Sequence, residues 1–141
     1  MEVPDKKIVE FLKIHHVLTL ATTIDNQPWC ANCFYAFNEQ TMNLIFTSGY
    51  ETRHIKEGTQ NPKVAGSIVL ETSVVGKIQG IQFSGELLMP EGELADLVNH
   101  VYLKRFPFAA LMDTTLWTLR IDYAKMTDNR LGFGKKLIWE R

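Results

Sequence analysis

Six blocks of the chain are rich in β-branched and aromatic residues and are bounded by turn-forming residues, which predicts β-strands. These blocks are residues 17–24, 29–37, 42–47, 64–70, 78–89 and 117–126. The turns at 25–28 and 38–41 are short, so the first three strands are expected to form an antiparallel meander. Period-two alternation places four residues of the last block on one face: Trp117, Leu119, Ile121 and Tyr123.

Short helices are predicted between the strands. Residues 5–15 repeat apolar residues at helical spacing, and Asp5 is placed to cap their start. Residues 51–58 form a second short helix that Pro62 stops. A third helix starts near Pro90, and residues 108–112 add a further helical turn. The apolar stripe of the third helix is Leu94, Leu97, Val98, Val101 and Phe106.

The combined pattern predicts a mainly β (α+β) fold, a six-stranded antiparallel barrel with short flanking helices. A length of 141 residues favours a single domain spanning 1–141. The composition, 45% hydrophobic and 22% charged, is that of a folded globular chain. Closing the sheet into a barrel removes the exposed edges that six strands otherwise leave.

Charge and hydropathy exclude several classes of protein. The net charge is −1 with dispersed basic residues, which argues against a dedicated nucleic-acid or membrane-surface binder. No apolar run approaches the roughly 20 residues that span a bilayer. The N-terminal residues lack the apolar region of a secretory signal, so a cytoplasmic location is expected.

Cys30 and Cys33 form a C-x-x-C spacing, which elsewhere indicates redox or zinc chemistry. Here the pair lies within a predicted strand, where positions three apart point to opposite faces. A zinc site also requires two further ligands, and no second C-x-x-C or spaced histidine pair is present. The pair is therefore expected to be two small buried residues, with no metal site.

No catalytic residue can be named from motifs. His15 and His16 are adjacent and diverge on either a helix or a strand, and His100 lies on the third predicted helix, where a solvated face is expected. The sequence contains no G-x-G-x-x-G or Walker motif, which removes the commonest signals for dinucleotides and ATP.

Residues 44–62, LIFTSGYETRHIKEGTQNP, present the strongest candidate site. Thr47 and Ser48 end a strand, Thr52 is placed to cap the next helix, and Arg53 and His54 begin it. A helix start carries unpaired N–H donors, and an Arg fork suits phosphate oxygens. The stretch is either a capped turn with a solvated arginine or a site for an anion such as phosphate.

Taken together, several blocks resemble a known superfamily. The segments VLTLAT, WCANCFYAF, LIFTSGYETRHIKEGTQNPKVAGSI, IQGIQFSGELL and YLKRFP occur in the order seen in the FMN-binding split-barrel superfamily, which includes pyridoxamine 5′-phosphate oxidase. The resemblance covers nearly the whole chain. The terminal LGFGKKLIW, with WCANCFY, TRH and RFP, is most similar to the small bacterial YhbP-like family, whose biochemical role is largely unassigned.

The resemblance implies an FMN cofactor and assigns residues to it. In the superfamily the end of the third strand and the following element bind the FMN phosphate, and the second strand flanks the isoalloxazine ring. The phosphate residues here would be Thr47, Ser48, Thr52, Arg53 and His54. The ring would lie against Ala31, Asn32 and Cys33.

The superfamily is typically a homodimer with flavin at the subunit interface. That arrangement implies an interface that can bury Trp29, Trp117 or Trp139. Gln82, Lys135 and Trp139 are then expected to reach a flavin from the partner subunit.

The chain departs from the oxidases where the substrate binds. The basic residues of the oxidases' second strand correspond here to Ala31 and Ala36, and Lys135 or Lys136 can compensate for the lost charge. Tyr102 and Arg105 resemble the Tyr/Arg pair for the substrate phosphate, but the spacing differs by one. The C-terminal Arg-x-His signature is missing, so oxidation of pyridoxine phosphate is not expected.

Two classes of function remain. The first is an FMN-dependent oxidoreductase acting on an unknown small molecule, in which the flavin performs the electron chemistry and the protein positions it. The second is a non-catalytic sensor or binding module for flavin or haem on the same scaffold. Haem requires an axial ligand, for which His54 and His100 are the candidates.

Overall fold

The computed structural model describes residues 2–112 and 115–141. Its strands are β1 (Val17–Ile24), β2 (Gln27–Asn38), β3 (Asn43–Thr47), β4 (Lys63–Val69), β5 (Gln79–Leu88), β6 (Leu116–Asp128) and β7 (Lys136–Glu140). Its α-helices are α1 (Lys6–Ile14), α2 (Arg53–Gln60) and α3 (Glu93–Arg105), and short 3₁₀ turns are η1 (Val75–Lys77), η2 (Pro107–Leu111) and η3 (Asn129–Leu131). The predicted strands and helices are all present, with ends shifted by a few residues.

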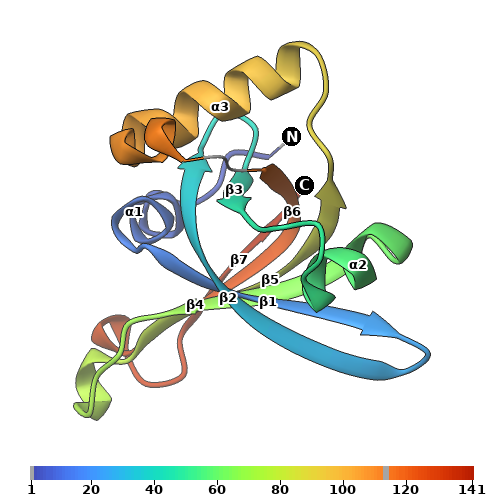
Figure 1. Ribbon diagram of the computed structural model, residues 1–141. Coiled ribbons are helices and arrows are strands. Elements are labelled where there is room, and N and C mark those ends of the chain that lie inside the picture. Colours follow the sequence, from blue (N-terminus) through green and yellow to red (C-terminus); the bar gives the residue numbers. More distant parts are fainter. Residues whose placement is uncertain (1, 113–114) are drawn as a thin grey trace.

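The sheet closes on itself. Its strand order is β3-β2-β1-β4-β5-β6-β7, and β3 also pairs with β6 (Figure 1). Strands β1 to β6 therefore form the predicted antiparallel barrel. The prediction of six strands was wrong in one respect, because the C-terminal segment forms β7 on the free edge of β6. A five-residue apolar tail did not reveal this strand, since its partner is supplied only by the closed sheet.

Strand β6 serves two neighbours along one edge. Its first part, from Leu116 to Arg120, pairs with β3, and its second part, from Tyr123 to Thr127, pairs with β7. Between them the register with β5 shifts, so that Gly85 pairs with Ile121 and Ser84 with Tyr123. This bulge turns Tyr123 away from the buried face, which corrects its predicted place beside Trp117 and Leu119.

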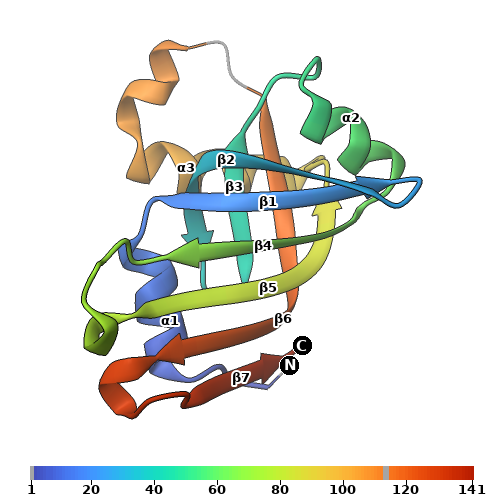
Figure 2. The ribbon, with the colours of Figure 1, turned by 90° about the horizontal axis from the view of Figure 1, so that it is seen from below.

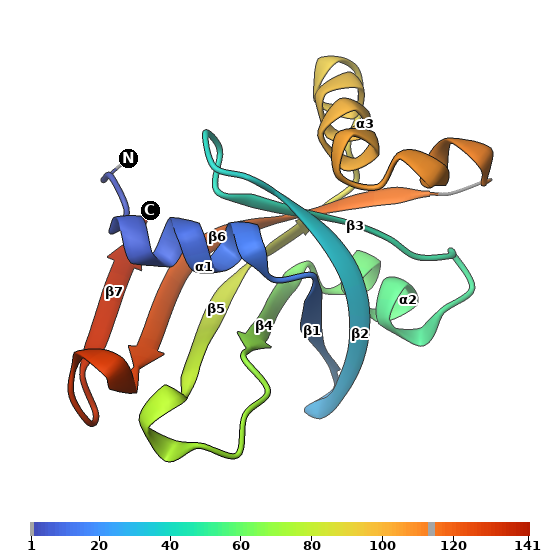
Figure 3. The ribbon, with the colours of Figure 1, turned by 90° about the vertical axis from the view of Figure 1, so that its left-hand side faces the viewer.

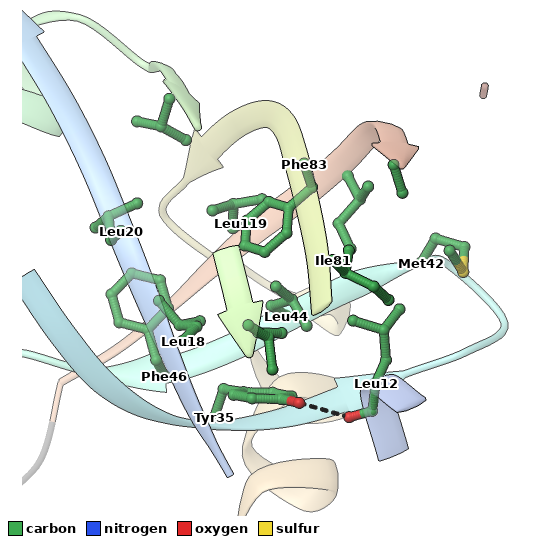
Figure 4. Close-up of a cluster of buried hydrophobic side chains, with 14 of the residues drawn as sticks. Leu12, Leu18, Leu20, Tyr35, Met42, Leu44, Phe46, Ile81, Phe83 and Leu119 are labelled. Atoms are coloured by element: carbon green, nitrogen blue, oxygen red, sulfur yellow. Dashed lines mark hydrogen bonds between the residues drawn. The ribbon is translucent and has the colours of Figure 1, made fainter. Parts of the chain in front are cut away.

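The barrel interior holds the main hydrophobic cluster, to which α1 contributes Ile8, Phe11 and Leu12. Asp5 caps α1 as predicted, because its carboxylate accepts a hydrogen bond from the Lys7 N–H at 2.8 Å. The fully buried Tyr35 of β2 donates its hydroxyl to the Leu12 carbonyl at 2.7 Å (Figure 4). This bond anchors the last turn of α1 to the barrel.

Two tryptophans that were expected at a subunit interface belong to this cluster. Trp117 is 1% and Trp139 2% exposed within one chain. The Trp117 indole N–H donates to the Ser48 carbonyl, and the Trp139 indole N–H donates to the Glu2 carbonyl. Their burial therefore needs no partner subunit, whereas Trp29 is 42% exposed.

Helix α3 covers the outer side of β2, β3 and β6 (Figure 3). Val98 and Tyr102 of α3 pack there with Ala36 of β2 and Ile45 of β3 as a second hydrophobic cluster. The predicted apolar stripe of α3 is largely right, but Leu97 lies 39% exposed at its margin. Among the described residues, no helix combines the length and apolarity that crossing a membrane requires.

The opposite outer face of the sheet, formed by β1, β4 and β5, has no helix in front of it (Figure 2). Short side chains alternate outward there, and Thr19, Ser67 and Gln82 follow one row across the three strands. We refer to this surface as the open sheet face.

Candidate functional site

The candidate site lies where β3 leaves the barrel and the chain turns into α2. The Ser48 N–H donates to the Thr115 carbonyl at 3.2 Å, and the Ser48 carbonyl accepts the indole N–H of Trp117 at 2.9 Å. The Thr52 hydroxyl and the Thr52 N–H both donate to the Gly49 carbonyl. These bonds fix the turn, so Ser48 and the start of α2 are held face to face.

Three of the predicted phosphate residues meet at this turn. The Ser48 hydroxyl oxygen lies 2.7 Å from Nε2 of His54, and the Thr52 hydroxyl oxygen lies 3.4 Å from the same nitrogen. Cys33 approaches from β2, with its sulfur 3.7 Å from the Ser48 hydroxyl. We call Ser48, Thr52 and His54 the polar cluster.

Thr52 does not cap α2 as predicted. Its hydroxyl donates to the Gly49 carbonyl, and its side chain makes no cap hydrogen bond to the helix. The first N–H groups of α2 are thus not occupied by the side chain of the preceding residue. Because a helix start has N–H groups without helical acceptors, this end of α2 retains hydrogen-bonding capacity toward an anion.

Burial shifts the pKa values of two residues at this site, His54 and Cys33. Desolvation lowers the pKa of His54, which favours the neutral imidazole. Desolvation also raises the pKa of the Cys33 thiol, and the hydrogen bond from Ser48 opposes this only in part. The raised pKa and the burial of Cys33 favour the protonated thiol over the reactive thiolate.

Arg53 precedes His54 in the chain, and its side chain is held by two contacts of its own. Its guanidinium lies 4.1 Å from the centre of the Trp29 ring of β2, and its Nε donates to Glu57 at 2.8 Å. Glu57 also accepts the Thr22 hydroxyl at 2.8 Å, which ties α2 to β1. Both interactions lower the pKa of Glu57, with the Arg53 hydrogen bond the larger cause. Within residues 2–112 and 115–141, no acceptor is seen for the terminal guanidinium nitrogens of Arg53.

Thr47, the fifth predicted phosphate residue, does not join the polar cluster. Successive strand residues point to opposite faces, so Thr47 turns toward α3, where its hydroxyl lies 3.5 Å from that of Tyr102. The structure therefore brings together Ser48, Thr52 and His54, directs the Arg53 side chain to Trp29 and Glu57, and separates Thr47 from the polar cluster.

The residues of β2 that were predicted to lie against the flavin ring also point to different faces of the sheet. Cys33 faces the polar cluster, whereas Asn32 is on the open sheet face, where it accepts the Thr19 hydroxyl at 2.9 Å. Cys30 is exposed, so the expectation that both cysteines are buried was wrong for this one. Gln82 shares the face of Asn32, and register places it three strands away, about 14 Å at ordinary strand spacing.

The two predicted tail residues lie in different environments. Lys135 is exposed in the turn before β7. Trp139 has its indole in the core, which contradicts the expectation that this side chain reaches a ligand of a partner subunit. Among the described residues, no three His, Cys, Asp or Glu side chains are grouped as a metal site requires.

Sequence reasoning missed Trp29, Glu57 and Trp117 as supports of the site. The spacing of Arg53 and Glu57, four residues apart on a helix, was a usable signal for the ion pair. Nothing local indicates that Trp29 lies beside Arg53 or that Trp117 binds the Ser48 carbonyl. These two contacts depend on the barrel bringing distant strands together.

Comparisons with solved structures identify the fold. The chain superposes on a haem-binding protein from Mycobacterium smegmatis with a TM-score of 0.76 and 19% identity, covering 93% of this chain and 56% of that one. It superposes on an FAD-binding protein from Mesorhizobium loti with a TM-score of 0.70 and 15% identity, covering 86% and 91% of the two chains. A NimC/NimA family protein from Clostridium acetobutylicum gives a TM-score of 0.66 and 24% identity, covering 95% and 91%.

Sequence comparison identifies the family. No protein-family model matches the chain. A UPF0306 protein from Photorhabdus laumondii is 42% identical over 134 residues, covering 95% of this chain and 94% of that protein. The UPF0306 protein YhbP from Escherichia fergusonii is 40% identical over 134 residues, covering 95% and 91%. The expected similarity to YhbP is confirmed, and this chain, a split barrel, belongs to the UPF0306 family.

Proposed function

We propose that this protein binds FMN, with the phosphate at the polar cluster and Arg53, and acts as a flavin-dependent oxidoreductase on a small molecule. The observation that carries the proposal is the convergence of Ser48, Thr52 and His54 at the start of α2. Hydroxyls, an arginine fork and helix N–H groups are the donors that bind phosphate in proteins.

The hydrogen-bond donors of the proposed site include a positive charge, which suits the negative charge of a phosphate. Arg53 uses only Nε on Glu57, and its side chain is 46% exposed, so the rest of its fork is accessible to an anion. One side chain opposes binding: the Glu51 carboxylate occupies the space that a β-carbon on residue 49 would take. Since Glu51 is exposed, its side chain can turn into solvent when an anion binds.

The fold neighbours support a flavin or haem ligand, because one is described as haem-binding and another as FAD-binding. The histidines favour flavin. Nε2 of His54 is engaged by Ser48, and His100 is exposed on α3, where it lines an open groove of mixed polarity with Lys13 and Lys104. Neither is presented to an apolar cavity as an axial haem ligand is.

A bound flavin supplies hydride or electron transfer. The residues of this chain would hold its phosphate and fix its orientation. The buried Cys33 thiol and the neutral His54 lie within the same group, and neither is assigned a catalytic role.

The direct test compares FMN with riboflavin, which lacks the phosphate. Titrating the flavin-free protein while following flavin fluorescence should give saturable FMN binding and riboflavin binding at least tenfold weaker. Equal affinities would place the phosphate outside the polar cluster. A Soret band on adding haem, with no uptake of FMN, would favour the binding-module alternative.

Oxidoreductase activity is tested separately. The FMN-loaded protein should reoxidise after reduction faster in the presence of its substrate than in buffer, as followed by flavin absorbance. A screen of small electron acceptors in which none accelerates reoxidation beyond free FMN would leave a flavin-binding module and refute the enzymatic part.

We also propose that two copies associate through the open sheet face, which would bring Gln82 of one chain toward the flavin of the other. The face carries exposed Val17 and Val69, 46% and 65% exposed, with no helix over them (Figure 2). Ser84→Arg on this face should convert a dimer into a monomer in sedimentation velocity. Ser73→Arg, at another exposed serine in the β4–β5 connection, is the matched control and should leave the dimer intact. Dissociation by both variants, or by neither, contradicts the proposal.

A further inference from the structure

A second cavity lies on the other side of β3 from the polar cluster, between β2, α3 and η2. Its volume is about 270 Å³. Its apolar lining consists of Phe34, Tyr102, Phe106, Phe108, Ala109 and Met112. Thr47 of β3 completes the lining.

The walls of this cavity are aromatic and tilted toward one another. The rings of Tyr102 and Phe106 have centroids 5.0 Å apart at 49°, and those of Phe34 and Phe106 have centroids 6.1 Å apart at 58°. Such spacings are those of favourable edge-to-face contacts between rings. A planar ring placed among them can therefore make the same contacts with several walls at once.

Several of these walls are open to solvent in the isolated chain. Phe34, Phe108 and Met112 are 61%, 67% and 62% exposed. Burying these three large apolar side chains under a ligand would contribute favourable free energy, because apolar surface would be removed from water. A contiguous exposed apolar surface of this kind marks a binding site.

Among the residues that the structure describes, the lining of the cavity has little polarity and no charged side chain. Its side-chain polar atoms are the hydroxyls of Thr47 and Tyr102, 3.5 Å apart. The neighbouring cation, Arg105, is outside the lining. It donates to the His15 carbonyl and lies over the Tyr35 ring, and its guanidinium is 5.7 Å from the centre of the Phe106 ring. Because the described lining contains no charged side chain, a charged ligand would lose hydration here without an ion pair from these residues.

We propose that this cavity binds an uncharged planar aromatic molecule of one or two fused rings, with a single polar group on the Thr47 and Tyr102 hydroxyls. The volume lies just below the roughly 300–1,000 Å³ of pockets for drug-sized ligands, which limits the ligand to this size. The site is separate from the polar cluster, since Thr47 and Ser48 point to opposite faces of the chain. The proposal therefore stands whether or not FMN binds.

The test uses three planar probes of nearly one shape: benzamide, benzoate and benzamidinium, which are neutral, anionic and cationic. Each is titrated into flavin-free protein with backbone amide and methionine methyl NMR signals as the readout. Benzamide should shift the signals of Met112, Ala109 and Tyr102 in a saturable way and bind at least tenfold more tightly than either ion. Equal or tighter binding of an ion, shifts away from the cavity, or no saturable shift overturns the proposal.

A pair of variants controls for general effects on the protein. Phe108→Asp places a carboxylate at the mouth of the cavity and should weaken benzamide at least tenfold while strengthening benzamidinium. Phe133→Asp alters a phenylalanine that is 78% exposed between η3 and β7 and should change both affinities by less than twofold. Equal effects of the two variants, or no effect of Phe108→Asp, would show that the cavity is not the binding site.

Discussion

Replacing Arg53 by alanine separates the binding of the phosphate from the stability of the fold. If the guanidinium contacts the FMN phosphate, its removal costs about 1.5–3 kcal/mol, the worth of a hydrogen bond to a charged group. Since about 1.4 kcal/mol changes an equilibrium tenfold, the dissociation constant of FMN should rise about ten- to hundredfold. Riboflavin, which lacks the phosphate, should bind both proteins with the same affinity.

The flavin-free variant should remain folded. The variant loses the stacking of the guanidinium on Trp29, which is worth about 0.5–1 kcal/mol at an exposed site. It also loses the ion pair with Glu57, which contributes little to stability because Arg53 is half exposed. The melting temperature should therefore fall by only a few degrees. Arg130→Ala removes another exposed arginine, which pairs with the buried carboxylate of Asp128, and should leave FMN affinity unchanged.

Removing the negative charge of Glu51 should have the opposite effect on FMN affinity. Its carboxylate lies against Gly49 and repels an anion at the polar cluster, so Glu51→Gln should strengthen FMN binding. One charge pair at about 4 Å in water is worth about 1 kcal/mol, which gives about a fivefold effect that decreases with added salt. Fluorescence titration of all four proteins measures these changes. An unchanged FMN affinity in Arg53→Ala, or an equal loss of riboflavin affinity, would refute the assignment of Arg53 to the phosphate.

Three further predictions concern the scaffold and its protonation. Gly85→Ala places a β-carbon 1.9 Å from the Arg120 carbonyl oxygen, so thermal unfolding should show a loss at or above the upper end of the about 1–3 kcal/mol typical of overpacking, whereas Gly76→Ala, with open space around it, should be neutral. Tyr35→Phe leaves the Leu12 carbonyl without its buried partner and should cost about 1–3 kcal/mol in urea unfolding; a wild-type value would show that α1 is not anchored there. Burial lowers the pKa of His54 in the folded chain below its usual 6.5, so the stability that the neutral imidazole contributes is present above about pH 6.5 and is lost as the pH falls from there through the lower pKa of the folded state. The difference in stability between wild type and His54→Gln should therefore shrink from pH 7 to pH 5, and a constant difference would contradict the burial of the imidazole.

Much of the fold follows from local pattern. The range of β1 was predicted residue for residue, and β2 to β6 lay within a few residues of their predicted bounds. Period-two alternation in β-branched segments and short polar turns contain this information, because both reflect the neighbouring residues alone. Strand β7 and the bulge before Tyr123 were not predicted, since each depends on a partner strand distant in the chain.

The sequence by itself determined that the polar cluster comes together: Ser48, Thr52 and His54 are within seven positions, so a strand end and a helix start suffice to gather them. Only the tertiary structure decided which of them share a surface. The alternation of β3 sends Thr47 to the far side, β2 brings Trp29 to Arg53 and Cys33 to Ser48, and β6 supplies the tryptophan that holds the Ser48 carbonyl. The physical reason is that chain connectivity places neighbours, whereas barrel closure and strand register place residues from distant segments.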